Sequence, residues 1–200
     1  MEEHVQILVE ADERFAQIVA EYGMPSFPSR PEGFESMVRT ILEQQVSLNS
    51  ARAVYYKLKE AALELTAENI LQLSDEVIRA CGITRQKTIY IKALAQAIVH
   101  GDVGFERYKT MHPDDVRQEL IKVKGIGNWT IDVYLMFSLR SPDILPLGDI
   151  GILASIKDLW GLTTMADILE LTKTWSPYRT AAAFLLWHYY LEKRGRKFPH

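Results

Sequence analysis

Val123-Lys124-Gly125-Ile126-Gly127-Asn128-Trp129-Thr130 is the stretch that decides the fold of this 200-residue chain. Its two glycines flank one apolar residue, Ile126, between two segments with helical periodicity. We expect Ile126 to turn inward, the glycines to leave backbone amides uncovered, and a second helix to start near Asn128. The stretch therefore predicts a tight turn between two helices, with the whole unit at about residues 113–139.

The start of the second of these helices predicts a site for an anion. Its first N–H groups have no intrahelical partner and lie at the positive end of the helix dipole. A backbone phosphate is the expected occupant. The turn carbonyls of Ile121, Val123 and Ile126 can hold a monovalent cation, Na⁺ or K⁺, that bridges to the phosphate. A plain turn between helices is the alternative interpretation of the two glycines.

Helical periodicity runs through almost the whole chain without sustained strand alternation, so we expect an all-α fold. The loop at residues 139–146, with two prolines, predicts a crossing between subdomains. We expect a central helical bundle at residues 33–140 and a terminal helical subdomain at residues 1–32 and 141–200, with the active cleft between them. The predicted helices include one from Val5 to Tyr22, one opened by Ser29-Arg30-Pro31, one capped by Thr163 or Thr164, and one capped by Ser176-Pro177 that ends near Lys193.

Composition excludes several classes of protein. An apolar fraction of 48% with mixed charge is typical of a globular domain, and the absence of eighteen consecutive apolar residues argues against a membrane span. The single cysteine, Cys81, excludes an intramolecular disulfide and four-cysteine zinc or iron–sulfur sites, and we expect it to be buried at a helix end. The N-terminus lacks the pattern of a signal peptide, so we expect a cytoplasmic protein. The net charge of −3 neither supports nor excludes binding to nucleic acid.

A second informative stretch is Pro146-Leu147-Gly148-Asp149, which places a carboxylate at the predicted start of another helix, twenty residues after Trp129. A helix N-terminus favours the ionised form of Asp149, which suits a group that stabilises positive charge during a reaction. A plain N-cap is the alternative role for this aspartate.

Several pieces of the chain together resemble a known family. Residues 120–132 resemble the helix-hairpin-helix motif of the DNA glycosylase superfamily, and the loop ending at Asp149 resembles its second signature. Over about residues 30–190 the chain is similar to the alkylbase branch, the 3-methyladenine DNA glycosylase II type, in a compact form without the N-terminal β domain. The pieces that carry this similarity are Glu43-Gln44-Gln45-Val46-Ser47, Gly82-Ile83-Thr84 with Lys87, and Trp175-Ser176-Pro177-Tyr178-Arg179-Thr180.

The resemblance implies a monofunctional DNA N-glycosylase of base excision repair that removes alkylated bases such as 3-methyladenine and 7-methylguanine. The damaged base is expected to flip out of the duplex, and Asp149 to assist hydrolysis of its N-glycosidic bond. Trp129 stands where bifunctional relatives carry a Schiff-base lysine, which implies the absence of lyase activity. Tyr178 and Arg179 are expected to brace the loop that carries Asp149.

The resemblance also implies the partners and the remaining site residues. The expected partner is double-stranded DNA with damaged bases, and we expect the protein to bind it as a monomer. We expect no contact with a membrane, no required cofactor and no iron–sulfur cluster. In a prokaryote we expect the protein to be associated with the nucleoid. Gln45 is expected to fill the space that the flipped base leaves, and Trp129, Trp187 and Tyr134 to line the base pocket. The residues expected to contact DNA are Gln45, Lys124, Gly125, Gly127 and Thr130.

Some alternatives stay open. A helix-hairpin-helix DNA-binding module without catalysis, and a monofunctional glycosylase for a different lesion, share most of these features. Ile150 and Val133 stand where the best-known members of the branch have tyrosines, which leaves the range of lesions open. Trp187 is also compatible with core packing, and Gln45 with an exposed turn at a helix end.

Overall fold

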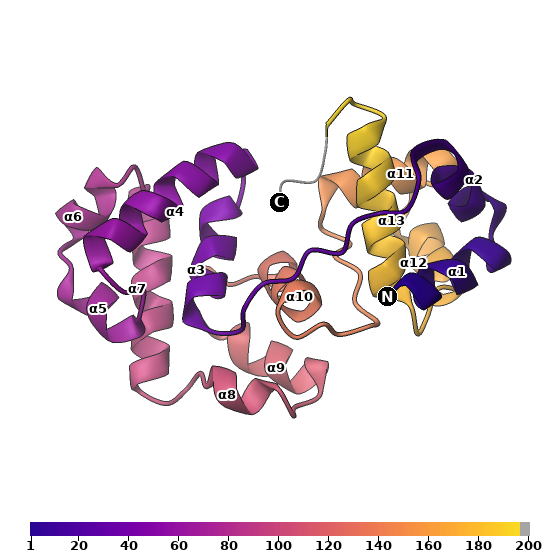
Figure 1. The fold of residues 1–200 in the computed structure, drawn as a ribbon. Coiled ribbons are helices and arrows are strands. Elements are labelled where there is room, and N and C mark those ends of the chain that lie inside the picture. Colours follow the sequence, from indigo (N-terminus) through magenta and orange to yellow (C-terminus); the bar gives the residue numbers. More distant parts are fainter. Residues whose placement is uncertain (197–200) are drawn as a thin grey trace. The chain divides into compact units, whose positions relative to one another are not determined.

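The structure, a computed structural model, describes residues 1–196, and within them the chain forms helices and no strand (Figure 1). The all-α prediction is confirmed for this part of the chain. The helices are α1 (Glu2–Ala11), α2 (Glu13–Tyr22), α3 (Phe34–Glu43), α4 (Leu48–Ala62), α5 (Ala67–Gln72), α6 (Asp75–Ala80), α7 (Arg85–Val99), α8 (Phe105–Tyr108), α9 (Pro113–Leu120), α10 (Asn128–Phe137), α11 (Ile150–Trp160), α12 (Met165–Lys173) and α13 (Arg179–Glu192).

The chain divides into two compact units. Unit 1 consists of Met1–Ser29 and Arg140–His200 and contains α1, α2 and α11–α13; its residues 197–200 lie outside the described part. Unit 2 is the continuous segment Arg30–Leu139 and contains α3–α10. The chain thus leaves unit 1 once and returns to it once, so segments from both ends of the chain build the same unit.

Helix α13 is central to unit 1, where it contacts α1, α2 and α11. Its residues 180–187 are all buried, as expected for a helix that other helices surround. The rings of Phe15, Trp160 and Trp175 pack against one another with centroids 5.3–5.4 Å apart. Such tilted and edge-on ring pairs add to the stabilisation that burial of the large side chains provides.

The prediction of a single helix from Val5 to Tyr22 is wrong. The segment forms two helices, α1 and α2, and Asp12 lies between them. The Asp12 carboxylate accepts a hydrogen bond from the Arg14 amide at 2.9 Å and so caps α2. Its other oxygen accepts a hydrogen bond from Trp160 Nε1 at 3.1 Å. The break is therefore supported by a partner far along the chain, which local periodicity does not reveal.

Helix α3 begins later than predicted. Its first residue is Phe34, after the N-cap Gly33, whereas the sequence pattern placed Pro31 in the first turn. The segment before the helix is held in another way, because the Arg30 amide donates a hydrogen bond to the Phe137 carbonyl at 2.9 Å. This bond places Arg30 beside the C-terminal end of α10, so the segment before Phe34 does not form a helical turn.

The later helix ends follow the sequence signals with one exception. Thr164 caps α12, and α13 ends with Lys193 as its C-cap, both as predicted. The N-cap of α13 is Tyr178, so the predicted cap at Ser176 is wrong. The Ser176 hydroxyl instead donates a hydrogen bond to the Asp143 carboxylate at 2.8 Å, which commits it to the loop before α11.

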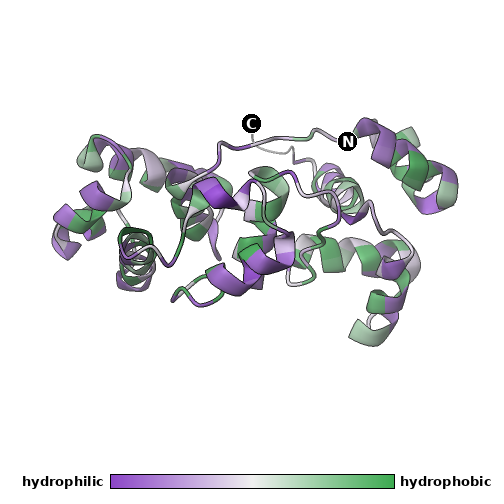
Figure 2. Ribbon diagram, turned by 90° about the horizontal axis from the view of Figure 1, so that it is seen from below, coloured by the Kyte–Doolittle hydropathy of each residue, from purple (hydrophilic) through white to green (hydrophobic). Residues whose placement is uncertain are grey.

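Unit 2 contains α3 packed against both α7 and α10, as Figure 1 shows, while α5 and α6 contact α7. Residues 130–137 of α10 are all buried. Figure 2 shows hydrophilic and hydrophobic residues alternating along the helices, the pattern expected of helices with one buried face. The core of unit 2 therefore fixes α10, and Gly125 and Gly127 lie directly before the N-terminus of this helix.

Two predictions from composition can be compared with the structure. Cys81 is the C-cap of α6 and is buried, as predicted, and burial raises the pKa of its thiol. Among residues 1–196, no helix combines the length and apolar character that a membrane span needs.

Candidate functional site

Helices α9 and α10 and the turn between them, hereafter the hairpin, form as predicted. Helix α10 begins at Asn128. Ile126 is 3% exposed, and its amide donates to the Val123 carbonyl at 3.1 Å to close the turn. An ion pair between Arg117 of α9 and Asp132 of α10 ties the two helices together. The hairpin is therefore held by a buried apolar residue inside and an ion pair across it.

The two glycines of the hairpin have different roles. Gly125 has φ +89°, and a Cβ atom there would lie 2.0 Å from Cγ of Tyr90, so the fold itself requires glycine. Gly127 has φ −103°, which any residue adopts, and no atom lies within 4 Å of a Cβ built on it. Gly127 is also the N-cap of α10 and provides no side-chain cap for the first-turn amides. The fold does not require glycine at position 127, but close approach of an anion would.

The other predicted DNA contacts on the hairpin divide into one exposed and one buried residue. Lys124 is exposed, which is compatible with a phosphate contact. Thr130 is 2% exposed, and its hydroxyl accepts a hydrogen bond from Gln44 Nε2 at 2.8 Å. Protein atoms cover the Thr130 side chain, and the contact of this residue with DNA stays a prediction.

The predicted ligands of a monovalent cation are the carbonyls of Ile121, Val123 and Ile126. The Val123 carbonyl accepts the Ile126 amide, so one of its two lone pairs closes the turn. Neutral carbonyl oxygens suit a weakly bound Na⁺ or K⁺, and one lone pair of Val123 remains compatible with such a ligand. The cation stays a prediction.

Asp149 is the N-cap of α11, and three N–H groups converge on its Oδ1 atom. The amides of Gly151 and Ile152 donate to this oxygen at 2.8 and 3.2 Å, and Trp187 Nε1 donates at 2.9 Å. A Cβ atom at Gly151 would lie 3.1 Å from the same oxygen and 3.2 Å from the Tyr190 ring. Asp149 therefore does cap α11, but N-capping does not require the additional hydrogen bond from the Trp187 indole. This bond fixes the orientation of the carboxylate.

The loop that leads to Asp149 is braced by α13, as predicted for Arg179. The Arg179 guanidinium binds the Asp143 carboxylate through two hydrogen bonds of 2.7 Å, and Arg179 holds the pKa of that carboxyl below its usual range. The Thr180 hydroxyl donates to the Ser141 carbonyl at 2.6 Å and accepts from the Ile144 amide at 3.0 Å. Charged and neutral bonds together therefore fix the loop before α11.

The two candidate tryptophans of the base pocket lie in different units. Trp187 is buried on α13 of unit 1, where its indole N–H binds Asp149 and its ring packs edge-on against Phe184. Trp129 is half-buried in the first turn of α10 in unit 2. The structure therefore joins Trp187 to the candidate catalytic aspartate, a contact that core packing alone does not explain.

Tyr134, the third residue predicted to line the base pocket, is buried in unit 2. It is 1% exposed, and its hydroxyl accepts a hydrogen bond from the Gly33 amide at 3.1 Å. Its ring also packs against Phe105, and burial raises the pKa of its hydroxyl to about 12. These contacts place Tyr134 in the core of unit 2, and its role in a base pocket stays a prediction.

Gln45 lies in the turn between α3 and α4, and its side chain is exposed. Its φ of +56° is in the left-handed region, which costs a residue with a side chain about 1–2 kcal/mol. Two nearby apolar residues, Val46 and Leu48, are also exposed, by 46% and 39%. An exposed amide flanked by apolar side chains is compatible with insertion into a base stack, whereas a left-handed residue directly after the C-cap is also common at plain helix ends. The role of Gln45 in filling the space of the flipped base stays a prediction.

Two residues that sequence reasoning did not assign to the site hold this turn in place. Gln44 Nε2 donates to the Gly125 carbonyl at 3.1 Å and to the Thr130 hydroxyl at 2.8 Å. Lys87 Nζ donates to the carbonyls of Leu42 and Gln44 at 2.7 and 2.8 Å. Both residues occur in the pieces that carry the family resemblance, but neither residue's partners can be read from the sequence.

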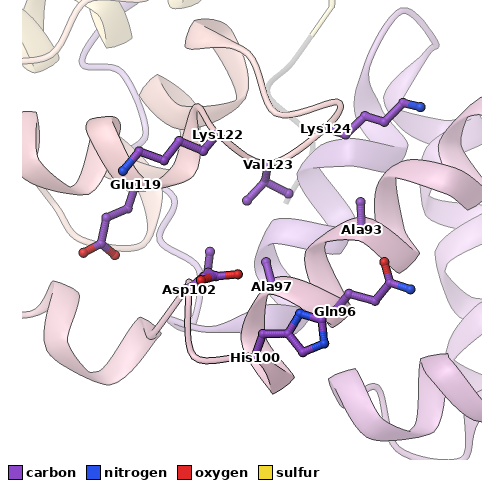
Figure 3. Close-up of a pocket in the computed structure, with 10 residues that line it drawn as sticks. Ala93, Gln96, Ala97, His100, Asp102, Glu119, Lys122, Val123 and Lys124 are labelled. Carbon is purple, nitrogen blue, oxygen red and sulfur yellow. The ribbon is translucent and has the colours of Figure 1, made fainter.

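A hollow of about 520 Å³ lies beside the hairpin in unit 2 (Figure 3). Lys122 and Lys124 share its lining with two carboxylates, Asp102 and Glu119. His100 is the one aromatic residue of the lining, and neither predicted pocket tryptophan takes part. Carboxylates repel phosphate, and a flipped cationic base needs rings on which to stack, so this hollow suits neither ligand.

The sequence and structure place the chain among known proteins. A family model, described as HhH-GPD superfamily base excision DNA repair protein, matches residues 38–177, and the chain belongs to this family. The chain is 29% identical over 191 residues to DNA-3-methyladenine glycosylase 1 of Schizosaccharomyces pombe. This alignment covers 92% of this chain and 84% of the relative. The chain is also 30% identical over 172 residues to DNA-3-methyladenine glycosylase of Bacillus subtilis. That alignment covers 78% of this chain and 57% of the relative.

A solved structure extends the comparison to three dimensions. The 3-methyladenine DNA glycosylase of Schizosaccharomyces pombe in complex with abasic DNA superposes with a TM-score of 0.82 at 28% sequence identity. The match covers 92% of this chain and 95% of that one. The resemblance to 3-methyladenine DNA glycosylases that the motifs indicate is confirmed.

Proposed function

We propose that this chain is a monofunctional DNA N-glycosylase that excises alkylated bases, such as 3-methyladenine and 7-methylguanine, in base excision repair. The observation that supports this best is Asp149, a carboxylate fixed by two helix amides and the Trp187 indole. Membership of a base excision repair family supports damaged DNA as the substrate. The names of the relatives support an alkylated base, and abasic DNA, bound in the Schizosaccharomyces pombe structure, is the product that such a reaction leaves.

The proposed reaction needs only one carboxylate. An N-glycosidic bond breaks through a sugar with oxocarbenium character, so the site must stabilise positive charge on the deoxyribose. A base alkylated at a ring nitrogen already carries positive charge, so it takes the electron pair of the glycosidic bond and leaves as a neutral molecule without a general acid. Water then bonds to C1′ of the deoxyribose and releases a proton, which leaves an abasic site. Asp149 supplies the negative charge, and its fixed orientation means that little reorganisation is needed as positive charge develops.

A direct experiment tests the proposal. The protein is incubated with DNA treated with a methylating agent, and the released bases are identified by mass spectrometry. We expect 3-methyladenine and 7-methylguanine among them. Release of deaminated or oxidised bases instead would favour a glycosylase for another lesion, and binding without release would favour a non-catalytic DNA-binding module.

Lyase activity is expected to be absent. Bifunctional enzymes form a Schiff base between a lysine and the sugar, whereas Trp129 stands at the corresponding position of this chain and offers no amine. Borohydride added during turnover is therefore expected to trap no covalent protein–DNA adduct. A bifunctional glycosylase treated in parallel is the control, and a trapped band with this protein would show that another lysine attacks the sugar.

Gln45→Ala is expected to slow excision most where the lesion lies in a stable base pair. Flipping costs a few kcal/mol of unstacking and unpairing, and the side chain that fills the vacated space recovers part of that cost. The measurement is the single-turnover excision rate of the wild type and the variant on a matched duplex and on single-stranded DNA. The same loss on both substrates would mean that Gln45 contributes ordinary binding or local folding.

A further inference from the structure

The turn that carries Gln45 is attached to the hairpin by the side chain of the preceding residue. Gln44 Nε2 donates to the Gly125 carbonyl at 3.1 Å, inside the hairpin turn, and to the Thr130 hydroxyl at 2.8 Å, in the first turn of α10. Thr130 is buried and Gln44 is half-buried, so the acceptor side of this contact lies within the protein. One amide group of unit 2 thus joins two segments that lie more than eighty residues apart in the sequence.

A second attachment holds the main chain of the same turn. Helix α3 ends at Glu43, so its last carbonyls have no partner within the helix. Lys87 Nζ donates to two carbonyls at this end, those of Leu42 and Gln44, at 2.7 and 2.8 Å. A cation also suits the negative end of the helix dipole. Burial lowers the pKa of Lys87, as expected for an ammonium group whose partners here are neutral carbonyls.

These two attachments account for the backbone of Gln45. A left-handed conformation of a residue with a side chain persists where its surroundings fix it. Here Lys87 binds the main-chain carbonyl of Gln44, and the hairpin binds the side chain of Gln44. The side chain of Gln45, by contrast, is exposed. The turn is therefore fixed at its base, while its tip is directed to the surface.

We propose that Gln44 is a positioning residue that locks the Gln45 turn onto the hairpin, so that the side chain entering the duplex and the amides holding the phosphate act as one rigid part. The proposal rests on the proposed function, in which Gln45 fills the space left by the flipped base. Rigid spacing matters because a side chain displaced by about 1 Å from its working position can lose much of its effect.

Gln44→Met tests this proposal because it keeps the length of the side chain and removes both hydrogen bonds. We expect excision from a matched duplex to slow about tenfold, within the range of coupling between residues in contact, and excision from single-stranded DNA to change little. We also expect the double variant Gln44→Met with Gln45→Ala to be no slower than Gln45→Ala alone. Such non-additivity shows that Gln44 acts through Gln45.

Two further variants separate positioning from folding. Gln72→Met changes an exposed glutamine of α5 in the same unit and is expected to match the wild type in excision. Thr130→Val removes one acceptor of Gln44 with little change of shape, and we expect it to reproduce part of the Gln44→Met effect. Thermal unfolding of each variant is measured alongside, so that Thr130→Val decides the question if Gln44→Met does not fold.

A readout without catalysis distinguishes failure of this inference from failure of the proposed function. Fluorescence of 2-aminopurine placed beside an abasic-site analogue reports unstacking when the protein binds. We expect Gln44→Met and Gln45→Ala to reduce the fluorescence rise equally. If Gln44→Met slowed excision equally on matched and single-stranded DNA, the positioning role of Gln44 would be overturned. The same would follow if the loss of rate in the double variant equalled the product of the losses in the two single variants. Normal unstacking by a wild type that releases no base would contradict the proposed function alone.

Discussion

Asp149→Asn is expected to reduce release of alkylated bases by ~10²-fold or more, the scale typical of removing a fixed electrostatic stabiliser. The variant keeps the shape of the side chain and loses the negative charge that the developing oxocarbenium ion needs. Binding to an abasic-site analogue is expected to stay within a few-fold of the wild type, because the hairpin amides are untouched. The measurements are the single-turnover excision rate on an alkylated duplex and the affinity for the analogue.

The choice of asparagine follows from the contacts of Asp149. Asparagine is as good an N-cap as aspartate, and its carbonyl oxygen can accept from Gly151, Ile152 and Trp187. Asp149→Ala, by contrast, removes the cap at a cost of about 1 kcal/mol and also removes the acceptor of the Trp187 bond. An unchanged unfolding temperature for Asp149→Asn would confirm that the fold survives. Excision near the wild-type rate would remove Asp149 from the mechanism.

Features of the fold that depend on local sequence were predictable. The hairpin followed from two glycines around one apolar residue, and the start of α10 at Asn128 followed from the same stretch. The division between α1 and α2 was missed although Asp12, which caps α2, is a local signal for a helix start, whereas its bond to Trp160 is distant in the sequence and could not be predicted. The start of α3 was missed for a similar reason, since Arg30 pairs with the backbone of Phe137. Periodicity reports burial along one segment and carries no information about such distant partners.

The candidate site shows the same division. The position of Asp149 at a helix N-terminus was predictable from its loop, but its bond to Trp187 was not. Thr130 and Tyr134 were assigned to ligand contact, yet both face the interior of unit 2. The buried stretch of α10 is apolar almost throughout, so its pattern does not distinguish a pocket wall from core. Gln44 and Gln45 are adjacent and chemically identical, and only the structure separates the anchored residue from the exposed one.

Gly127→Asp is expected to weaken binding to any duplex, damaged or undamaged, by about 10- to 100-fold. This range corresponds to losing hydrogen bonds to a charged group worth about 1.5–3 kcal/mol. The φ of −103° and the open space around position 127 admit a side chain, and aspartate is a favourable N-cap. The variant is therefore expected to fold at least as well as the wild type. Its carboxylate would occupy the first-turn amides of α10 and repel the phosphate that they are proposed to bind.

Gly127→Ala is the matched control, because it adds a Cβ atom to the same open space without a charge or a capping group. We expect it to bind DNA much more tightly than Gly127→Asp. Affinities for damaged and undamaged duplexes are measured at several salt concentrations, since losing one phosphate contact lowers the salt dependence by about one unit of slope. Phosphate contacts carry no information about the base, so the two duplexes must lose affinity alike. A loss confined to damaged DNA would instead place Gly127 near the lesion and leave the phosphate anchor to another part of unit 2.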